Sequence, residues 1–242
     1  MSVYGGPEIT NNGLVLALDA ANPKSYPGSG TAWTDLSGLN NNATMFGTVP
    51  YAVDTAACFD FATTTGASSS SSTLGFTFTG NMIPTTGSFT LACWIKNPPP
   101  TSQIGLFSNA GGADGYRFGI GTTGVYTLIS GAGAVGYTEP TTNFLSTLSD
   151  SLWYNVVMLY DRAGTFNSGT PQFRLYLNGV LQGTTAMPAS QPAFSSSTPG
   201  LVRSACCSLY TGKLSSFSAY SRALSAEEVL NNFNALRGRF NI

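Results

Sequence analysis

Short runs of β-branched and aromatic residues recur along this chain, separated by clusters of Gly, Pro, Asn and Ser. Runs of this length, bounded by turn-forming residues, are typical of β-strands. We predict strands at Leu14–Asp19, Ala43–Phe46, Cys58–Phe61, Phe76–Thr79, Ser88–Lys96, Ile104–Ser108, Tyr116–Ile120, Val125–Ile129, Leu152–Asp161, Gln172–Leu177, Val180–Thr184 and Lys213–Tyr220. So many strands without intervening helices indicate an all-β sandwich or barrel.

Two of these segments carry more specific signals. Alternation along Ser88–Lys96 assigns one set of residues to the core, namely Phe89, Leu91, Cys93 and Ile95. The alternate set, Thr90, Ala92, Trp94 and Lys96, is expected on a face that is half exposed to solvent. Farther on, Asn178 and Gly179 lie between two apolar runs and favour the positive φ angles of a type I′ turn, so we predict a hairpin there.

One helix is predicted near the end of the chain. Ser225 followed by Glu228 has the spacing of a capping box. The apolar stripe that follows is Val229, Leu230, Phe233 and Leu236. Gly238 is the expected C′ residue, and the helix is expected to pack on the outside of a sheet or to close an open end of the sandwich.

The length and the pattern favour one domain. A β-sandwich of 242 residues commonly forms a single domain, which we place at residues 13–242. Residues 1–12 have no periodic pattern and contain Gly5, Gly6 and Pro7, so we expect an N-terminal arm that docks on a neighbouring molecule.

Charge is scarce, because Asp, Glu, Lys and Arg together make up 9% of the chain and the net charge is −1. Nucleic-acid binding depends on neutralising phosphates, so this composition excludes that class of partner. A surface built from uncharged polar residues instead favours contact with neighbouring subunits.

The first residues lack the basic and apolar regions of a signal peptide, and no apolar run is long enough to cross a bilayer, so we expect no membrane partner and synthesis in a cytosol. Under those conditions the four cysteines, Cys58, Cys93, Cys206 and Cys207, are expected to be free thiols. No cofactor is expected.

Several motifs together resemble the concanavalin A-like, laminin-G-like lectin and glucanase superfamily over nearly the whole chain. They are Ser88–Lys96, Trp153–Asp161, the hairpin Leu175–Gly183 and the tail Tyr220–Glu228. The resemblance implies a jelly-roll β-sandwich. The segments Gly13–Tyr26, Trp33–Gly38 and Asn232–Phe240 are also similar to domains of tailed-bacteriophage virion proteins. That similarity implies a decoration, head-fibre or tail-associated subunit, assembled in the host cytoplasm and bound to other virion proteins and to copies of itself.

Catalysis is not expected. Glycan-cleaving enzymes place two carboxyl groups about 5 to 9 Å apart, and no two acidic residues stand two apart on a predicted strand. The glutamates are only Glu8, Glu139, Glu227 and Glu228. The chain has no histidine, which removes the general base of a Ser-His-Asp or Cys-His device.

Oxygen-bearing residues between Asp35 and Asn42 form the one candidate loop for calcium, with Asp35, Asn40 and Asn42 as the weak candidate ligands. Where relatives often carry two adjacent Asp residues, this chain has Ser215 and Ser216. A turn stabilised by Asx side chains is therefore favoured over a metal site.

Sugar binding without catalysis requires aromatic rings and polar groups. The candidates for glycan contact are Trp33, Tyr116, Tyr126 and Tyr137, although core or interface packing is the favoured role of each. Three functions follow in order: a structural virion subunit, a carbohydrate-binding module that attaches to host polysaccharide, and, least favoured, a glycan-cleaving enzyme. The second predicts an exposed aromatic cluster at one end of the sandwich.

Overall fold

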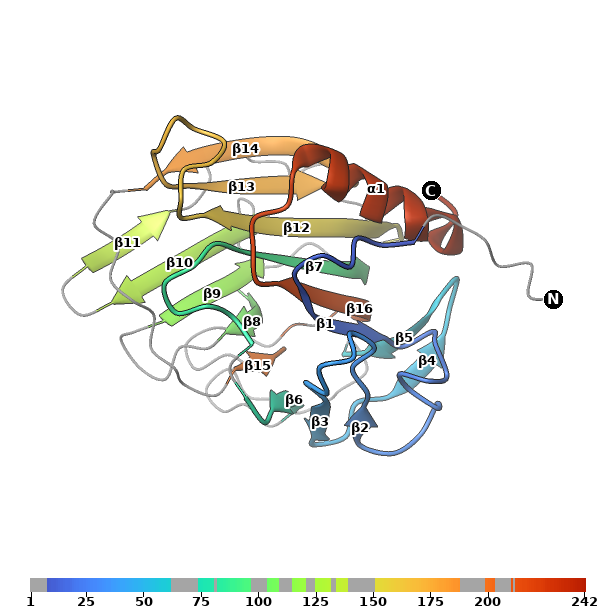
Figure 1. Ribbon diagram of the computed structural model, residues 1–242. Helices are drawn as coiled ribbons and strands as arrows, with labels where there is room; N and C mark the ends of the chain where they lie inside the picture. The colour runs from blue at the N-terminus through green and yellow to red at the C-terminus, as the bar shows by residue number, and fades with distance from the viewer. Residues whose placement is uncertain are drawn as a thin grey trace.

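The computed structural model describes residues 8–61, 74–80, 82–96, 104–108, 115–120, 125–131, 134–138, 151–187, 199–202, 210 and 212–242. Two antiparallel sheets lie face to face, and the one α-helix found among these residues lies on the outside of one of them (Figure 1). This arrangement confirms the predicted all-β sandwich with one short C-terminal helix.

The helix-side sheet has the order β14 (Val180–Ala186), β13 (Gln172–Leu177), β12 (Trp153–Asp161), β7 (Phe89–Lys96), β16 (Lys213–Tyr220), β5 (Ala57–Asp60) and β4 (Tyr51–Val53). Strand β5 pairs with Lys213 and Leu214 at the start of β16, and strand β1 (Leu14–Asp19) pairs with residues 216–220 of the same strand. The centre of this sheet is therefore built from strands that are far apart in sequence, β7 between β12 and β16.

The far sheet has the order β11 (Ala134–Thr138), β10 (Val125–Gly131), β9 (Gly115–Ile120), β8 (Ile104–Ser108), β15 (Gly200–Leu201), β6 (Gly75–Phe78), β3 (Ala43–Phe46) and β2 (Ala32–Trp33). The twelve predicted strands are present, with ends shifted by at most two residues. The prediction missed β2, β4, β11 and β15, of which three have only two or three residues.

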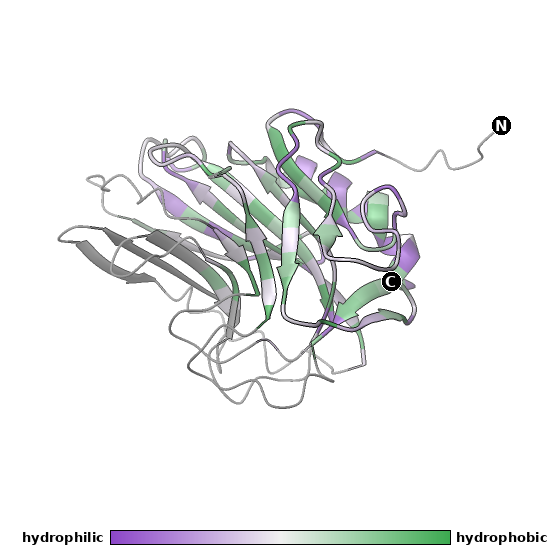
Figure 2. Ribbon diagram, turned by 90° about the horizontal axis from the view of Figure 1, so that it is seen from below, coloured by the Kyte–Doolittle hydropathy of each residue, from purple (hydrophilic) through white to green (hydrophobic). Residues whose placement is uncertain are grey.

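Apolar side chains from the facing surfaces of the two sheets fill the core. Hydrophobic residues recur along the strands that are coloured by hydropathy in Figure 2. On β7 the predicted core set, Phe89, Leu91, Cys93 and Ile95, is at most 1% exposed. The alternation along this strand therefore identified the core face.

On the opposite face of β7, Ala92 and Lys96 are partly exposed, as expected, whereas Thr90 and Trp94 correct the expectation because they are at most 1% exposed. Helix α1 (Ala226–Leu236) and the chain that follows it cover this face. The Trp94 ring stacks on Phe240 with ring centroids 3.9 Å apart, and Phe233 lies 5.7 Å away. The helix thus packs on the outside of a sheet.

The two ends of α1 differ in how well they were predicted. The Ser225 and Glu228 capping box is confirmed, with both reciprocal hydrogen bonds present. Gly238 directly follows the C-cap residue Arg237, as predicted, but it does not adopt the left-handed conformation that ends many helices, because the chain continues in a 3₁₀ turn, Arg237–Phe240. The left-handed residue that ends this turn is Asn241, with a φ of 58°.

The turn between β13 and β14 is confirmed, since Asn178 and Gly179 have φ angles of 50° and 78°. The Asn178 side-chain Oδ1 also accepts a hydrogen bond from the backbone N–H of Asn155 at 2.9 Å. This contact ties the hairpin to β12.

Residues 8–12 are bound to the domain itself. The amide of Thr10 donates to Asn232 Oδ1 at 2.8 Å, and Arg222 Nε donates to the carbonyl of Asn12 at 2.9 Å. Residues 1–7 of the predicted arm lie outside the described residues.

Cys58 and Cys93 are buried free thiols, as predicted, and burial raises the pKa of Cys58 to about 11. Cys206 and Cys207 lie outside the described residues. In the part of the chain that the structure describes, α1 is too short to cross a membrane, and no longer helix is found.

Candidate functional site

The Asp35 loop is closed by its own hydrogen bonds. Asp35 is 6% exposed, and its Oδ1 accepts from the amides of Ala17 and Ser37 at 2.8 and 2.9 Å. Its Oδ2 accepts from the Ser37 hydroxyl at 2.6 Å and from the Asn41 amide at 3.0 Å. The carboxylate is therefore already engaged by four donors.

The two asparagines of that loop do not complete a metal site. Asn42 Oδ1 accepts from the Asp35 amide at 2.9 Å, and Asn40 occupies a left-handed turn position with a φ of 59°. Within the described residues no cluster of acidic or thiol side chains could hold a metal ion. The loop has the Asx-stabilised turn that was favoured for it.

Trp33 lies in the core. It is 0% exposed, and its ring packs against Phe59 and Phe76, with centroids 4.7 and 4.9 Å away. No face of the indole is open to a ligand, which removes Trp33 from the set of glycan-contact residues.

The three candidate tyrosines lie on far-sheet strands. Tyr126 pairs with Gly119, Tyr137 pairs with Leu128, and Tyr116 pairs with Ile129. Their role in glycan contact stays a prediction.

The predicted exposed aromatic cluster stays a prediction, because the exposure of Tyr116, Tyr126 and Tyr137 lies outside what the structure describes. Among the described residues the large exposed hydrophobics are aliphatic, namely Leu36, Leu39, Val53, Leu152, Val180, Leu181, Leu230 and Ile242.

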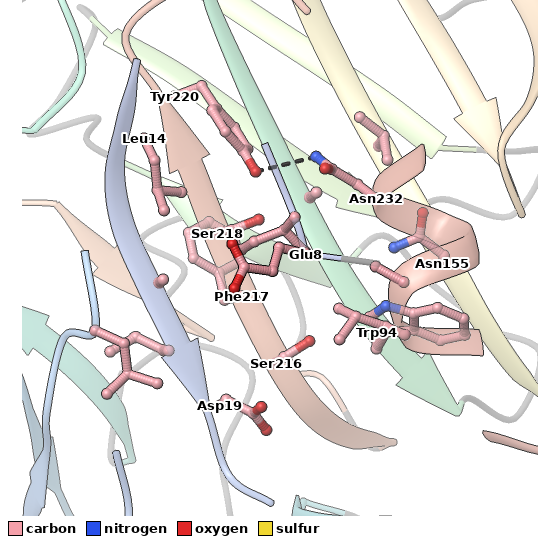
Figure 3. A pocket seen from close by; sticks show the side chains of 18 of the residues that line it. Glu8, Leu14, Asp19, Trp94, Asn155, Ser216, Phe217, Ser218, Tyr220 and Asn232 are labelled. Atoms are coloured by element: carbon pink, nitrogen blue, oxygen red, sulfur yellow. Dashed lines mark hydrogen bonds between the residues drawn. The ribbon is translucent and has the colours of Figure 1, made fainter. Parts of the chain in front are cut away.

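A groove of about 670 Å³ lies on the outer face of the helix-side sheet, beside α1 (Figure 3). We call it the helix groove. It is lined by Glu8, Ile9, Asn11, Leu14, Ala17, Leu18, Asp19, Asn22, Leu36, Ala92, Trp94, Asn155, Val157, Ser216, Phe217, Ser218, Tyr220, Leu224, Val229, Asn232, Ala235, Leu236 and Arg239.

Two rows of residues cross the sheet beneath the helix groove. One row is formed by small or apolar residues in register, Ala17, Ser218, Ala92 and Val157. The next row is more polar and runs Asp19, Ser216, Trp94 and Asn155. The small side chains of the first row leave open the volume of the helix groove above the sheet. The polar atoms of the second row give the floor of the groove, which is the sheet surface, hydrogen-bonding capacity.

Trp94 and Asn155 are directly opposite each other in the register of β7 and β12, and both line the helix groove. Asn155 is 5% exposed; its Nδ2 donates to the carbonyl of Cys93 at 3.3 Å, and its Oδ1 has no partner. The indole Nε1 of Trp94 also has no partner. Native proteins leave few buried polar atoms unpaired.

Charge in the helix groove is mostly neutralised. Arg239 donates to both carboxylate oxygens of Asp19, at 2.7 and 2.8 Å. Glu8 is the other carboxylate, and it projects over the floor (Figure 3). The groove therefore has no unpaired cation among its lining residues and carries a small negative excess.

The helix groove contains two carboxyl groups among its lining residues, those of Glu8 and Asp19. General acid and base catalysis requires two carboxyl groups in different protonation states, and here Asp19 is committed to Arg239. What the groove offers is a neutral set of donors and acceptors on a rigid sheet.

Sequence reasoning did not single out Asn155. The available signal was an amide residue inside the otherwise apolar run Trp153–Asp161, since Asn is depleted in strands. All nine residues of β12 prove to be buried. A polar side chain in such a strand must find a partner inside the protein or in a ligand.

Solved structures with this fold include several binding domains. The binding domain of Paraclostridial Mosquitocidal Protein 1 is 16% identical, with a TM-score of 0.68, over 92% of this chain and 52% of that one. The binding domain of Botulinum neurotoxin DC in complex with SialylT is 16% identical, with a TM-score of 0.65, over 94% of this chain and 52% of that one. The chain thus spans about half the length of these two domains.

A third similar structure matches over nearly its whole length. Domain 4 of AbnA, an extracellular arabinanase from Geobacillus stearothermophilus, in complex with arabinotriose, is 13% identical with a TM-score of 0.63. The match covers 92% of this chain and 98% of that domain. At such identities the similarity establishes the fold.

Comparison by sequence identifies a family. A search of curated proteins found no match. Residues 68–230 match the family described as the concanavalin A-like lectin/glucanases superfamily, laminin G type. The match includes the strands β7, β12 and β13 and the first turn of α1, up to residue 230, and these segments carried the resemblance in the sequence. The chain therefore belongs to the concanavalin A-like lectin/glucanases superfamily.

Proposed function

We propose that this chain is a non-catalytic carbohydrate-binding module that attaches to polysaccharide on a cell surface. The observation that carries the proposal is the helix groove, about 670 Å³ of space with seryl and amide side chains on a rigid sheet. Such a lining supplies hydrogen bonds for hydroxyl groups while Ala17, Ala92 and Val157 offer apolar surface for C–H groups.

The comparisons support this function over catalysis. Two structures of similar fold are binding domains, one of them in complex with SialylT, and a third is an arabinanase domain in complex with arabinotriose. The helix groove adds that no second free carboxylate lies beside Glu8 among its lining residues.

A glycan array tests the proposal. The purified full chain, labelled at Lys24 or another exposed amine, is applied to immobilised bacterial, plant and animal saccharides. Selective retention on a subset, with millimolar or tighter affinity by calorimetry and no release of reducing sugar, is the expected result. Absence of retention on every saccharide, or release of reducing sugar, would contradict it.

A second function, as a structural subunit of a tailed-phage particle, is favoured by the composition. With charged residues at 9%, the surface is depleted as interface cores are. In this proposal the chain is assembled into virions in the host cytoplasm and contacts other virion proteins and copies of itself. Cryo-electron microscopy of particles from the source tests it: symmetric occupancy on a shell or tail is expected, and absence from every particle would oppose it.

A further inference from the structure

We infer that the helix groove selects uncharged saccharides, and that one ligand hydroxyl is bound jointly by Asn155 and Trp94. This inference rests on the proposed carbohydrate-binding function and specifies its ligand. The starting observation is a pair of buried polar atoms without partners on two adjacent strands, the Oδ1 of Asn155 and the Nε1 of Trp94.

The two atoms have opposite hydrogen-bonding character. An amide oxygen only accepts and an indole N–H only donates, whereas a hydroxyl group does both. Because Asn155 and Trp94 are direct register partners, a single hydroxyl seated between them can satisfy each. Figure 3 shows the two side chains next to each other on the floor beside α1.

The unpaired indole N–H is common to Trp33, Trp94 and Trp153, so what distinguishes Trp94 is its place in the lining of the helix groove. Trp94 and Trp153 are both at most 2% exposed, belong to the cluster with Phe233 and Phe240, and have an unpaired Nε1. Only Trp94 of the two lines the helix groove. Trp153 is therefore a matched control.

Charge sets the ligand class. An acidic sugar needs a cation, and Arg239, the cation among the lining residues, is held by Asp19 through two hydrogen bonds. Glu8 adds a negative charge at the same opening. Sialylated and uronic-acid saccharides are thus repelled, whereas neutral hexose and pentose oligosaccharides meet no such barrier.

The flat floor complements a sugar ring. Ala17, Ser218 and Ala92 are in register across three strands, so no bulky side chain separates a ligand from the sheet at that row. The Trp94 ring faces are occupied by stacking on Phe240. The ring therefore serves through its N–H edge and not as a stacking platform.

The test combines an array with three variants. Neutral saccharides are expected to be retained and acidic ones rejected. Asn155→Leu and Trp94→Phe should each weaken affinity for the best neutral saccharide about 10-fold, the effect of one lost hydrogen bond. Trp153→Phe should change it less than about 2-fold. Thermal unfolding of Asn155→Leu should change little, because the variant loses the 3.3 Å hydrogen bond to the Cys93 carbonyl but also removes the buried Oδ1 that has no partner.

Nuclear magnetic resonance of the unsubstituted chain makes the test independent of any folding defect. The chain has three tryptophans, so three indole N–H signals are expected. Titration with the neutral saccharide should shift the Trp94 signal and leave those of Trp33 and Trp153 in place. The inference is overturned if the Trp94 indole signal does not shift, or if Trp153→Phe weakens affinity as much as Trp94→Phe does. A preference for acidic saccharides over neutral ones would also overturn it. No binding to any saccharide would instead refute the proposed function on which it rests.

Discussion

Glu228 joins the start of helix α1 to the end of strand β16 through Arg222. Its carboxylate accepts two hydrogen bonds from the guanidinium of Arg222, at 2.6 and 2.8 Å, and one from the Ser225 amide at 2.8 Å. Arg222 also donates to the carbonyl of Asn12, so the same cluster holds the segment that precedes β1. The Glu228 carboxylate therefore anchors the N-terminal end of the helix that forms one wall of the helix groove.

Substituting Glu228 should separate its two roles. Glu228→Gln keeps an acceptor for the Ser225 amide but loses the ion pair, and we expect a loss of about 0.5–1 kcal/mol. Glu228→Ala loses both, and about 1–2 kcal/mol is expected. Chemical denaturation monitored by circular dichroism measures the difference. Equal losses for the two variants would show that the capping hydrogen bond contributes nothing.

Acid should destabilise the fold partly through Asp54. Hydrogen bonds from Lys96 and Lys213, at 2.9 and 3.0 Å, hold the pKa of this carboxyl well below its usual range. The native state then binds fewer protons than the unfolded chain, whose Asp has a pKa of about 3.9. This contribution to stability is complete above that value and is lost as the pH falls below it.

Asp54→Asn is the variant that tests this source of acid sensitivity. Unfolding midpoints measured between pH 7 and pH 2 should fall less steeply for Asp54→Asn than for the unsubstituted chain. The variant should also be less stable at pH 7, because the substitution removes the negative charge that pairs with Lys96 and Lys213. Parallel curves for the two proteins would assign the acid sensitivity to other carboxyl groups.

Gly179 is expected to resist substitution for two reasons. Its φ of 78° strains any other L residue, and an added Cβ would lie 3.0 Å from Leu230 Cδ1 and 3.2 Å from a Phe233 ring carbon. Gly179→Ala should cost about 1–2 kcal/mol. Gly238 is the matched control, because its φ is ordinary and nothing lies within 4 Å of an added Cβ. Gly238→Ala should be neutral or slightly stabilising in the same denaturation assay.

Trp33 should affect stability and not binding. It is 0% exposed and packs edge-on against Phe59, so Trp33→Phe leaves a cavity and should cost about 1–3 kcal/mol. Saccharide affinity, measured by calorimetry at a temperature where the variant is folded, should be unchanged. A selective loss of affinity would return Trp33 to the binding site.

Period-two alternation predicted the fold well because each sheet has a buried face, as Phe89 and Leu91 show. It failed for the outer face of β7, since the burial of Trp94 depends on a helix 132 or more residues later in the chain. The same limit hid the helix groove. Trp94 and Asn155 become neighbours only through β7 and β12 pairing, and no local pattern encodes which polar atom lacks a partner. Gly238 was expected to end the helix in a left-handed conformation. Asn241 has that conformation instead, at the end of the 3₁₀ turn that follows α1.

Removal of residues 1–12 tests whether the N-terminal segment serves the domain or an external partner. The deletion abolishes the bond from the Thr10 amide to Asn232 and that from Arg222 to the Asn12 carbonyl. Both lie at the surface, so we expect an intact β-type spectrum and a midpoint lowered by a few degrees, about 1 kcal/mol. Thr10→Pro, which removes only the amide donor, should reproduce part of that shift. If the segment also docks on a particle, the deletion should weaken attachment to it far more than Thr10→Pro does. Equal attachment of both variants and the full chain would restrict these residues to the domain.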